Sequence, residues 1–155
     1  MTGVFEVNSV EETWDLARRL AAELKPGDVV CLEGDLGAGK TTFTQGLAAA
    51  LGVTGRVTSP TFCIVQEHPA SAARTARPDA VSLLVHMDLY RLQDESDVEA
   101  IGWEDYLSRG ALLVVEWPER AGSLIPPTAR HLEFRHSDGE ERRLIRIDSS
   151  GLFGV

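Results

Sequence analysis

Residues 34 to 41 read GDLGAGKT, and this spacing of glycines, lysine and threonine is typical of a phosphate-binding loop. Glycines let backbone N–H groups curl around phosphate oxygens, because they adopt conformations that other residues avoid. Lys40 would place a positive charge beside the β- and γ-phosphates of a nucleotide, and the Thr41 hydroxyl is suited to Mg²⁺. The segment therefore predicts a site for a nucleotide with magnesium.

The segments on either side of this loop support that interpretation. VVCL, residues 29 to 32, is a continuous apolar run, as expected for a strand that is covered on both faces. After the loop, apolar residues at helical spacing predict a helix that ends near Gly52. The positive end of such a helix would point at the same phosphates.

Two further apolar runs end in acids. Asp88 follows VSLLVHM, and Glu116 follows ALLVV. Open α/β sheets bind ligands at the carboxyl ends of their strands, so both acids are candidates for the nucleotide site. One could hold the metal, directly or through water, and the other could orient an attacking water. His86 shares a strand face with Asp88, where it either tunes that carboxylate or is a structural, hydrogen-bonded histidine.

The segment SPTF, residues 59 to 62, follows the predicted helix. Nucleotide switches commonly place a loop here whose hydroxyl senses the γ-phosphate and Mg²⁺, and Pro60 would restrict how Thr61 is presented. A plain turn that leads into a strand explains the same residues.

The order of these elements predicts the fold class. Buried strands separated by helices indicate a three-layer α/β fold like that of P-loop NTPases, with a mostly parallel central sheet flanked by helices. We expect a single domain over residues 1–155, and antiparallel strands at the edges. Segment 3–8 predicts an edge strand, Ser9 caps a first helix, 118–127 is a turn region, and 131–137 with 141–148 form a hairpin that is added at an edge.

Composition narrows the class of protein. The chain has 155 residues and a net charge of -9, which disfavours gripping nucleic acid unaided, because phosphate contacts need a basic surface. Cys31 and Cys63 lie in apolar runs without metal-ligand spacing and are expected to be buried structural residues. The N-terminal segment does not resemble a signal peptide, and no run approaches 18 apolar residues. We therefore expect a cytoplasmic protein with no membrane contact.

Four motifs occur in a characteristic order, namely GDLGAGKTTF, VTSPTF, HMDLYR and VEWPE. Together they closely resemble the TsaE (YjeE) family, the bacterial ATPase of tRNA threonylcarbamoyladenosine biosynthesis. The resemblance covers nearly the whole chain and is weakest over residues 69–80 and the C-terminal tail. The first motif is generic, whereas the combination of the last two is specific.

The resemblance implies a Mg²⁺-dependent ATPase that binds ATP and ADP and hydrolyses ATP in partnership with the TsaD and TsaB proteins. In that family TsaD transfers a threonylcarbamoyl group to the adenosine beside the anticodon. ATP hydrolysis by TsaE supports repeated turnover rather than the transfer. The chain would then meet tRNA indirectly, through the complex, which agrees with its acidic charge.

The resemblance also implies roles for individual residues. Thr41, Glu116 and Asp88 would serve the metal, and Lys40, Asp88, Glu116 and Thr61 the reaction. Trp117 would form an aromatic wall against the adenine, where core packing is the alternative. Ser9, Val10 and a basic residue, Arg142 or Arg143, would lie near the nucleotide. The phosphates would contact Gly34, Asp35, Leu36, Gly37, Ala38, Gly39, Lys40, Thr41 and Thr42.

Two other functions use the same loop. A small-molecule P-loop kinase would need an acceptor pocket and an arginine-bearing lid, for which residues 74–77 are candidates by composition. A nucleotide-dependent binding module would release no phosphate, and the pair of acids argues against it.

Overall fold

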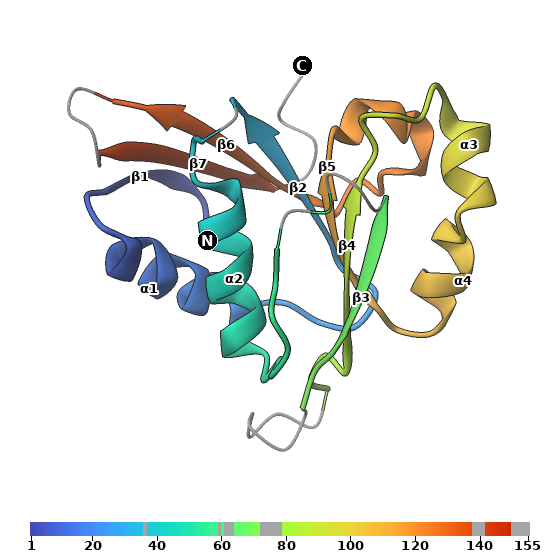
Figure 1. Ribbon diagram of the computed structural model, residues 1–155, viewed down its shortest axis with the longest axis horizontal. Coiled ribbons are helices and arrows are strands. Elements are labelled where there is room, and N and C mark those ends of the chain that lie inside the picture. The colour runs from blue at the N-terminus through green and yellow to red at the C-terminus, as the bar shows by residue number, and fades with distance from the viewer. Residues whose placement is uncertain (36, 59, 61–63, 72–78, 138–141, 150–155) are drawn as a thin grey trace.

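One seven-stranded sheet organises the chain, with helices on both faces (Figure 1). The computed structural model describes residues 1–155 except 36, 59, 61–63, 72–78, 138–141 and 150–155. The strands are β1 (Gly3–Val7), β2 (Val29–Gly34), β3 (Val65–Pro69), β4 (Leu83–Asp88), β5 (Leu112–Glu116), β6 (Arg130–His136) and β7 (Arg143–Ser149). The helices are α1 (Val10–Ala21), α2 (Lys40–Ala50), α3 (Glu95–Ala100) and α4 (Trp103–Ser108). The α/β class predicted from the sequence is confirmed.

The sheet is parallel at its centre and antiparallel at its sides, in the order β1-β7-β6-β2-β5-β4-β3. β2 pairs in parallel with both β5 and β6, and β5 pairs in parallel with β4. β3 closes one side against β4, and β1 closes the other against β7. Since parallel neighbours end at the same sheet edge, β2, β4 and β5 bring their carboxyl ends together.

The hairpin of β6 and β7 lies inside the sheet, and the prediction that it is added at an edge was wrong. β6 pairs along β2, where Leu32 lies opposite Leu132, so the hairpin supplies the partner that the central strand needs on that side. β1, predicted as an edge strand, then pairs with β7 and becomes the edge.

Residues 118–127, predicted as a turn region, contain two short 3₁₀ helices, η2 (Pro118–Arg120) and η3 (Gly122–Leu124). Pro118 starts η2, where its fixed φ suits a first helical turn and its missing N–H is not needed.

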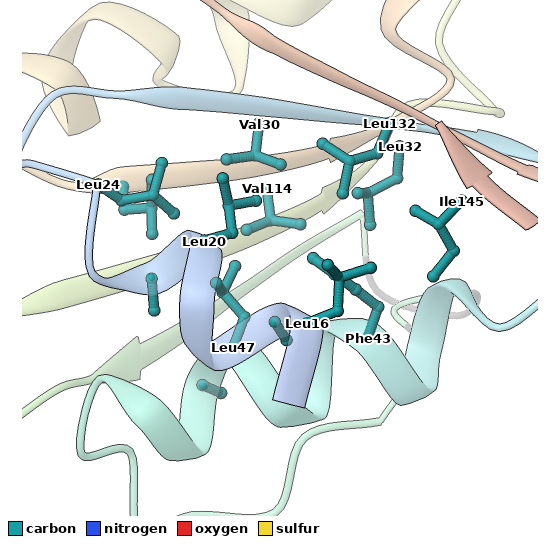
Figure 2. Close-up of a cluster of buried hydrophobic side chains, with 14 of the residues drawn as sticks. Leu16, Leu20, Leu24, Val30, Leu32, Phe43, Leu47, Val114, Leu132 and Ile145 are labelled. Atoms are coloured by element: carbon teal, nitrogen blue, oxygen red, sulfur yellow. The ribbon is translucent and has the colours of Figure 1, made fainter. Parts of the chain in front are cut away.

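Helices α1 and α2 pack side by side on one face of the sheet. Figure 2 shows Leu16 and Leu20 of α1 and Phe43 and Leu47 of α2 pointing toward the strands, where they meet Val30, Val114 and Leu132. α1 begins at the predicted cap, since the Ser9 hydroxyl accepts a hydrogen bond from the Glu12 N–H at 3.1 Å. This packing fixes α2, and therefore the loop that precedes it, against β2.

The other face is covered by α3, α4 and the two 3₁₀ helices. Trp103 of α4 is fully buried there against Val85, Met87 and other strand residues. Cys31 faces the same core, and burial, with lesser contributions from Glu33 and Glu119, raises the pKa of its thiol to about 12. This confirms the burial predicted for Cys31, whereas Cys63 lies outside the described residues. None of the described helices has the length and apolarity that crossing a membrane requires.

Candidate functional site

The phosphate-loop segment joins the end of β2 to the start of α2, as the sequence predicts. Gly37 and Gly39 have φ of 78° and 105°, values that side-chain-bearing residues rarely adopt. Gly39 caps α2 without a side-chain hydrogen bond, which suits a helix start that binds an anion. Asp35 is exposed, and its carbonyl accepts the Ala38 N–H at 3.0 Å, whereas Leu36 lies outside the described residues.

Gly34 is required by the close approach of β6. Its φ is 144°, and a Cβ placed on it would lie 2.5 Å from the carbonyl oxygen of Phe134. A larger residue would therefore push β6 away from β2 at the start of the loop.

We predict that Gly34→Ala lowers the free energy of unfolding by about 3 kcal/mol or more, because it adds a backbone clash to an unfavourable φ. Gly27→Ala is the matched control, since Gly27 has φ of 87° with no atom within 4 Å of the added Cβ. Urea denaturation of both variants measures the difference. Equal losses would show that the approach of Phe134 costs nothing.

Lys40 and Glu116 meet across the mouth of the loop. The Lys40 Nζ donates to the Gly34 carbonyl at 2.7 Å and lies 3.6 Å from Oε1 of Glu116. Glu116 ends β5, is 6% exposed, and lies opposite Leu32 of β2 in the sheet register. The predicted lysine and one predicted acid therefore share one site.

Glu116 also contacts His86, whose Nε2 lies 2.8 Å from Oε2. Burial acts to raise the pKa of the Glu116 carboxyl, but the hydrogen bond and charge of His86, together with Lys40, outweigh it and lower that pKa. The acid is therefore ionised at neutral pH, as a metal ligand must be.

Asp88 lies directly opposite Glu116 in the pairing of β4 with β5, so both acids point to the same face of the sheet. Asp88 is only half-buried, and its Oδ1 accepts the Tyr90 N–H at 3.0 Å. The two acids therefore lie side by side, as their positions at strand ends predict, with Glu116 buried and Asp88 half-buried.

Two aromatic side chains flank these acids. Trp117 is the one described non-glycine residue with a positive φ, 58°, and its ring centroid lies 4.9 Å from that of Tyr90. Trp117 is 40% exposed and Tyr90 is 57% exposed, so Trp117 is not a core residue. Such strained backbone is typical of functional sites. Tyr90 was missed as a site residue, although its position just after Asp88 was a usable signal.

These groups line a cleft of about 670 Å³, the phosphate-loop cleft. Its wall consists of Gly34, Asp35, Gly37, Gly39, Lys40, Thr41, Thr42, Asp88, Tyr90, Glu116 and Trp117. Nearly all the described residues predicted for the site are therefore in one place. Ala38 is buried beneath the loop, and Thr61 lies outside the described residues.

A second cleft of about 280 Å³, the N-terminal cleft, shares Gly37, Gly39 and Thr42 with the first. Its remaining wall comes from Ser9, Val10, Glu11, Thr13 and Arg143. Of the two arginines considered from sequence, Arg143 lines this cleft, whereas Arg142 pairs with Glu6 at 3.2 Å. The loop therefore lies between the phosphate-loop cleft with its acids and the N-terminal cleft at the start of α1, and a further hollow of about 350 Å³ adjoins Gly34, Lys40 and Trp117.

The oxygen ligands in the phosphate-loop cleft suit Mg²⁺, which prefers hydroxyl and carboxylate oxygens. In the described part of the chain, no three His, Cys, Asp or Glu side chains are grouped to hold a metal ion unaided. Nucleotide-bound Mg²⁺ needs only one or two carboxylates, because phosphates and water supply the other ligands. The residues thus fit Mg²⁺ that arrives with a nucleotide.

Fold and site together define an α/β protein with a glycine-rich loop facing two strand-end acids. The model of the family described as threonylcarbamoyl adenosine biosynthesis protein TsaE matches residues 7–145, and the chain belongs to this family. It is 42% identical to the TsaE protein of Bacillus subtilis over 134 residues, 86% of this chain and 78% of that protein. It is 38% identical to the Mycobacterium tuberculosis H37Rv protein over 146 residues, 88% and 82% of the two chains.

A solved structure agrees with these matches. The crystal structure of YdiB from Bacillus subtilis superimposes with a TM-score of 0.73 at 33% sequence identity, covering 97% of this chain and 87% of that one. The family predicted from the four motifs is confirmed.

Proposed function

We propose that this chain is a Mg²⁺-dependent ATPase with a P-loop NTPase-like fold, and that its hydrolysis of ATP to ADP and phosphate supports tRNA threonylcarbamoyladenosine synthesis. The observation that carries the proposal is the convergence of Lys40, Thr41, Asp88 and Glu116 on one cleft, in a chain of the TsaE family. The curated relatives are named for the same biosynthesis.

We assign each residue a role, which for the described residues is supported by their surroundings. The loop amides and Lys40 would hold the phosphates, and Lys40 would leave the Gly34 carbonyl to do so. Thr41 and the more buried Glu116 would hold Mg²⁺, which when bound neutralises charge on the phosphate oxygens. Asp88, half-buried beside it, would orient the attacking water. Thr61 would act as the switch hydroxyl.

The proposed partners are the TsaD and TsaB proteins, through which the chain would meet tRNA indirectly in the cytoplasm. The net charge of -9 supports this, since an acidic protein is unsuited to gripping tRNA by itself. A partner could also complete the site, so we expect hydrolysis to be faster in the complex than alone.

Reconstitution tests the proposal. Purified chain, TsaD, TsaB, unmodified tRNA, a threonylcarbamoyl donor and Mg²⁺–ATP should give several rounds of modification per TsaD, with phosphate released. Replacing ATP with a non-hydrolysable analogue should stop repeated turnover. Label from the γ-phosphate on a small acceptor would support the kinase alternative, and turnover that persists with the analogue would contradict the proposal.

Trp117 should report nucleotide binding. We predict that ADP changes the tryptophan fluorescence of the wild-type protein and that Trp117→Phe abolishes the change, because this exposed ring lines the phosphate-loop cleft. Trp14→Phe is the control, since Trp14 is similarly exposed but lines neither cleft. A signal that survives Trp117→Phe would contradict the prediction.

The same assay tests whether Trp117 stacks on the adenine. Tripolyphosphate with Mg²⁺ carries the phosphates without a base. A fluorescence response to ADP with no response to tripolyphosphate would support stacking of the adenine on Trp117. An equal response to tripolyphosphate would place the phosphates beside Trp117 and favour the N-terminal cleft, with Ser9, Val10 and Arg143, as the site of the base.

A further inference from the structure

His86 is a fully buried polar residue that is hydrogen-bonded to Glu116, the proposed metal ligand, on the neighbouring strand. Its imidazole is 0% exposed, it belongs to β4, and its Nε2 lies 2.8 Å from Oε2 of Glu116 on β5. A carboxylate only accepts hydrogen bonds, so Nε2 carries the proton and donates it. The bond therefore fixes both the orientation of the imidazole and the direction of the carboxylate.

The two carboxylate oxygens of Glu116 have different partners. Oε2 faces His86, whereas Oε1 faces Lys40 at 3.6 Å, on the side of the phosphate-loop cleft. In the proposed function Lys40, which also donates to the Gly34 carbonyl, moves to a phosphate, and its contact with Glu116 is then weakened. His86 is the contact to Glu116 that remains when Lys40 moves.

We propose that His86 is a positioning residue that holds Oε2 of Glu116 and thereby directs Oε1 at Mg²⁺ bound with the nucleotide. The inference rests on the proposed function and deepens it. His86 touches neither metal nor phosphate in this arrangement and acts only through Glu116. Groups of this kind, behind a metal ligand, typically change metal affinity or activity by about 10- to 100-fold when removed.

Packing alone does not account for an imidazole at this position. Its neighbours on the same sheet face include the apolar side chains of Leu84 and Val114, and burying a polar ring there costs free energy unless it is hydrogen-bonded. The Nδ1 atom of His86 has no hydrogen-bond partner within the described residues. The hydrogen bond to Glu116 is thus the one described contact that repays the burial of this ring.

His68 provides a matched control. It lies on the adjacent strand β3, is 9% exposed, and has an Nε2 atom without a hydrogen-bond partner in the described part of the chain. Among the described residues, neither a hydrogen bond nor an ion pair joins it to Glu116. Its replacement therefore perturbs the same buried region without touching the acid.

Calorimetry of ADP binding with and without Mg²⁺ tests the inference. In the wild-type protein Mg²⁺ should tighten ADP binding, and in His86→Leu this gain should fall about tenfold, while ADP affinity without Mg²⁺ changes little. His86→Gln should restore most of the gain, because its amide N–H reaches about as far as Nε2. His86→Asn, whose amide is too short, should behave like the leucine variant, and His68→Leu should keep the gain.

The outcomes are distinct. A full Mg²⁺ gain in folded His86→Leu or His86→Asn would overturn the inference and leave the proposed function intact. Equal losses in His86→Gln and His86→Asn, or a matching loss in His68→Leu, would assign the effect to packing and also overturn it. A wild-type protein that binds no ADP would overturn the proposed function, and this inference with it. Should the leucine variant fail to fold, the comparison of glutamine with asparagine decides.

Discussion

Replacing Lys40 with alanine should slow phosphate release from ATP by about a hundredfold or more while the protein stays folded. The ammonium is the positive charge closest to Glu116 in the phosphate-loop cleft, and its described contacts are with the Gly34 carbonyl and that acid. Loss of the charge removes stabilisation where negative charge develops on the phosphates. Steady-state phosphate release, in the presence of TsaD and TsaB, measures the effect.

Lys25→Ala is the natural control for this variant, because Lys25 is the chain's other lysine and is exposed after α1. It makes the same change in net charge and lines neither cleft. Repeated tRNA modification should stop in Lys40→Ala and continue in Lys25→Ala. Intact modification in folded Lys40→Ala would contradict the proposed function.

Glu116→Gln should reduce phosphate release by about a hundredfold through a different step, the binding of Mg²⁺. The amide keeps the shape of the side chain and an oxygen for the His86 N–H, but it removes the charge that attracts the metal. Lys40 is then no longer drawn to Oε1, so ADP affinity without Mg²⁺ should be unchanged or higher. Calorimetry over a range of Mg²⁺ concentrations separates these effects.

Glu104→Gln is the matched control, because Glu104 is exposed on α4 and lines none of the clefts beside the phosphate loop. We expect its Mg²⁺ dependence to equal that of the wild-type protein. Equal Mg²⁺ dependence in Glu116→Gln and wild type would show that Glu116 is not the metal ligand, and would direct attention to Asp88.

Much of the site could be predicted from sequence because its residues follow strands. The spacing of glycines in residues 34–41 predicts a phosphate-binding loop without knowledge of the rest of the fold. Asp88 and Glu116 follow apolar runs whose parallel pairing brings their ends together. Their adjacency needed only that β4 and β5 be neighbours. Motif order then supplied the family.

Contacts between strands could not be predicted in the same way. The bond from His86 to Glu116 and the tilted ring contact of Tyr90 with Trp117 both depend on β4 lying beside β5 in a particular register, which no local pattern specifies. The hairpin was misplaced for a related reason. Alternation in residues 131–148 indicates two paired strands, but not that one of them also pairs with β2.

The position of the hairpin has a consequence for how the protein is made. β1 is synthesised before the other described elements, yet its described partner, β7, is synthesised after them. Until β6 has been synthesised, the edge of β2 that receives it is bare, and a bare strand edge invites pairing with other chains. Pairing strands that lie far apart in the sequence, as β1 and β7 do, is slow, because a long loop must close first. The nascent protein is therefore most vulnerable to misassembly at β2 in the interval after its phosphate loop has been synthesised and before β6 has been synthesised.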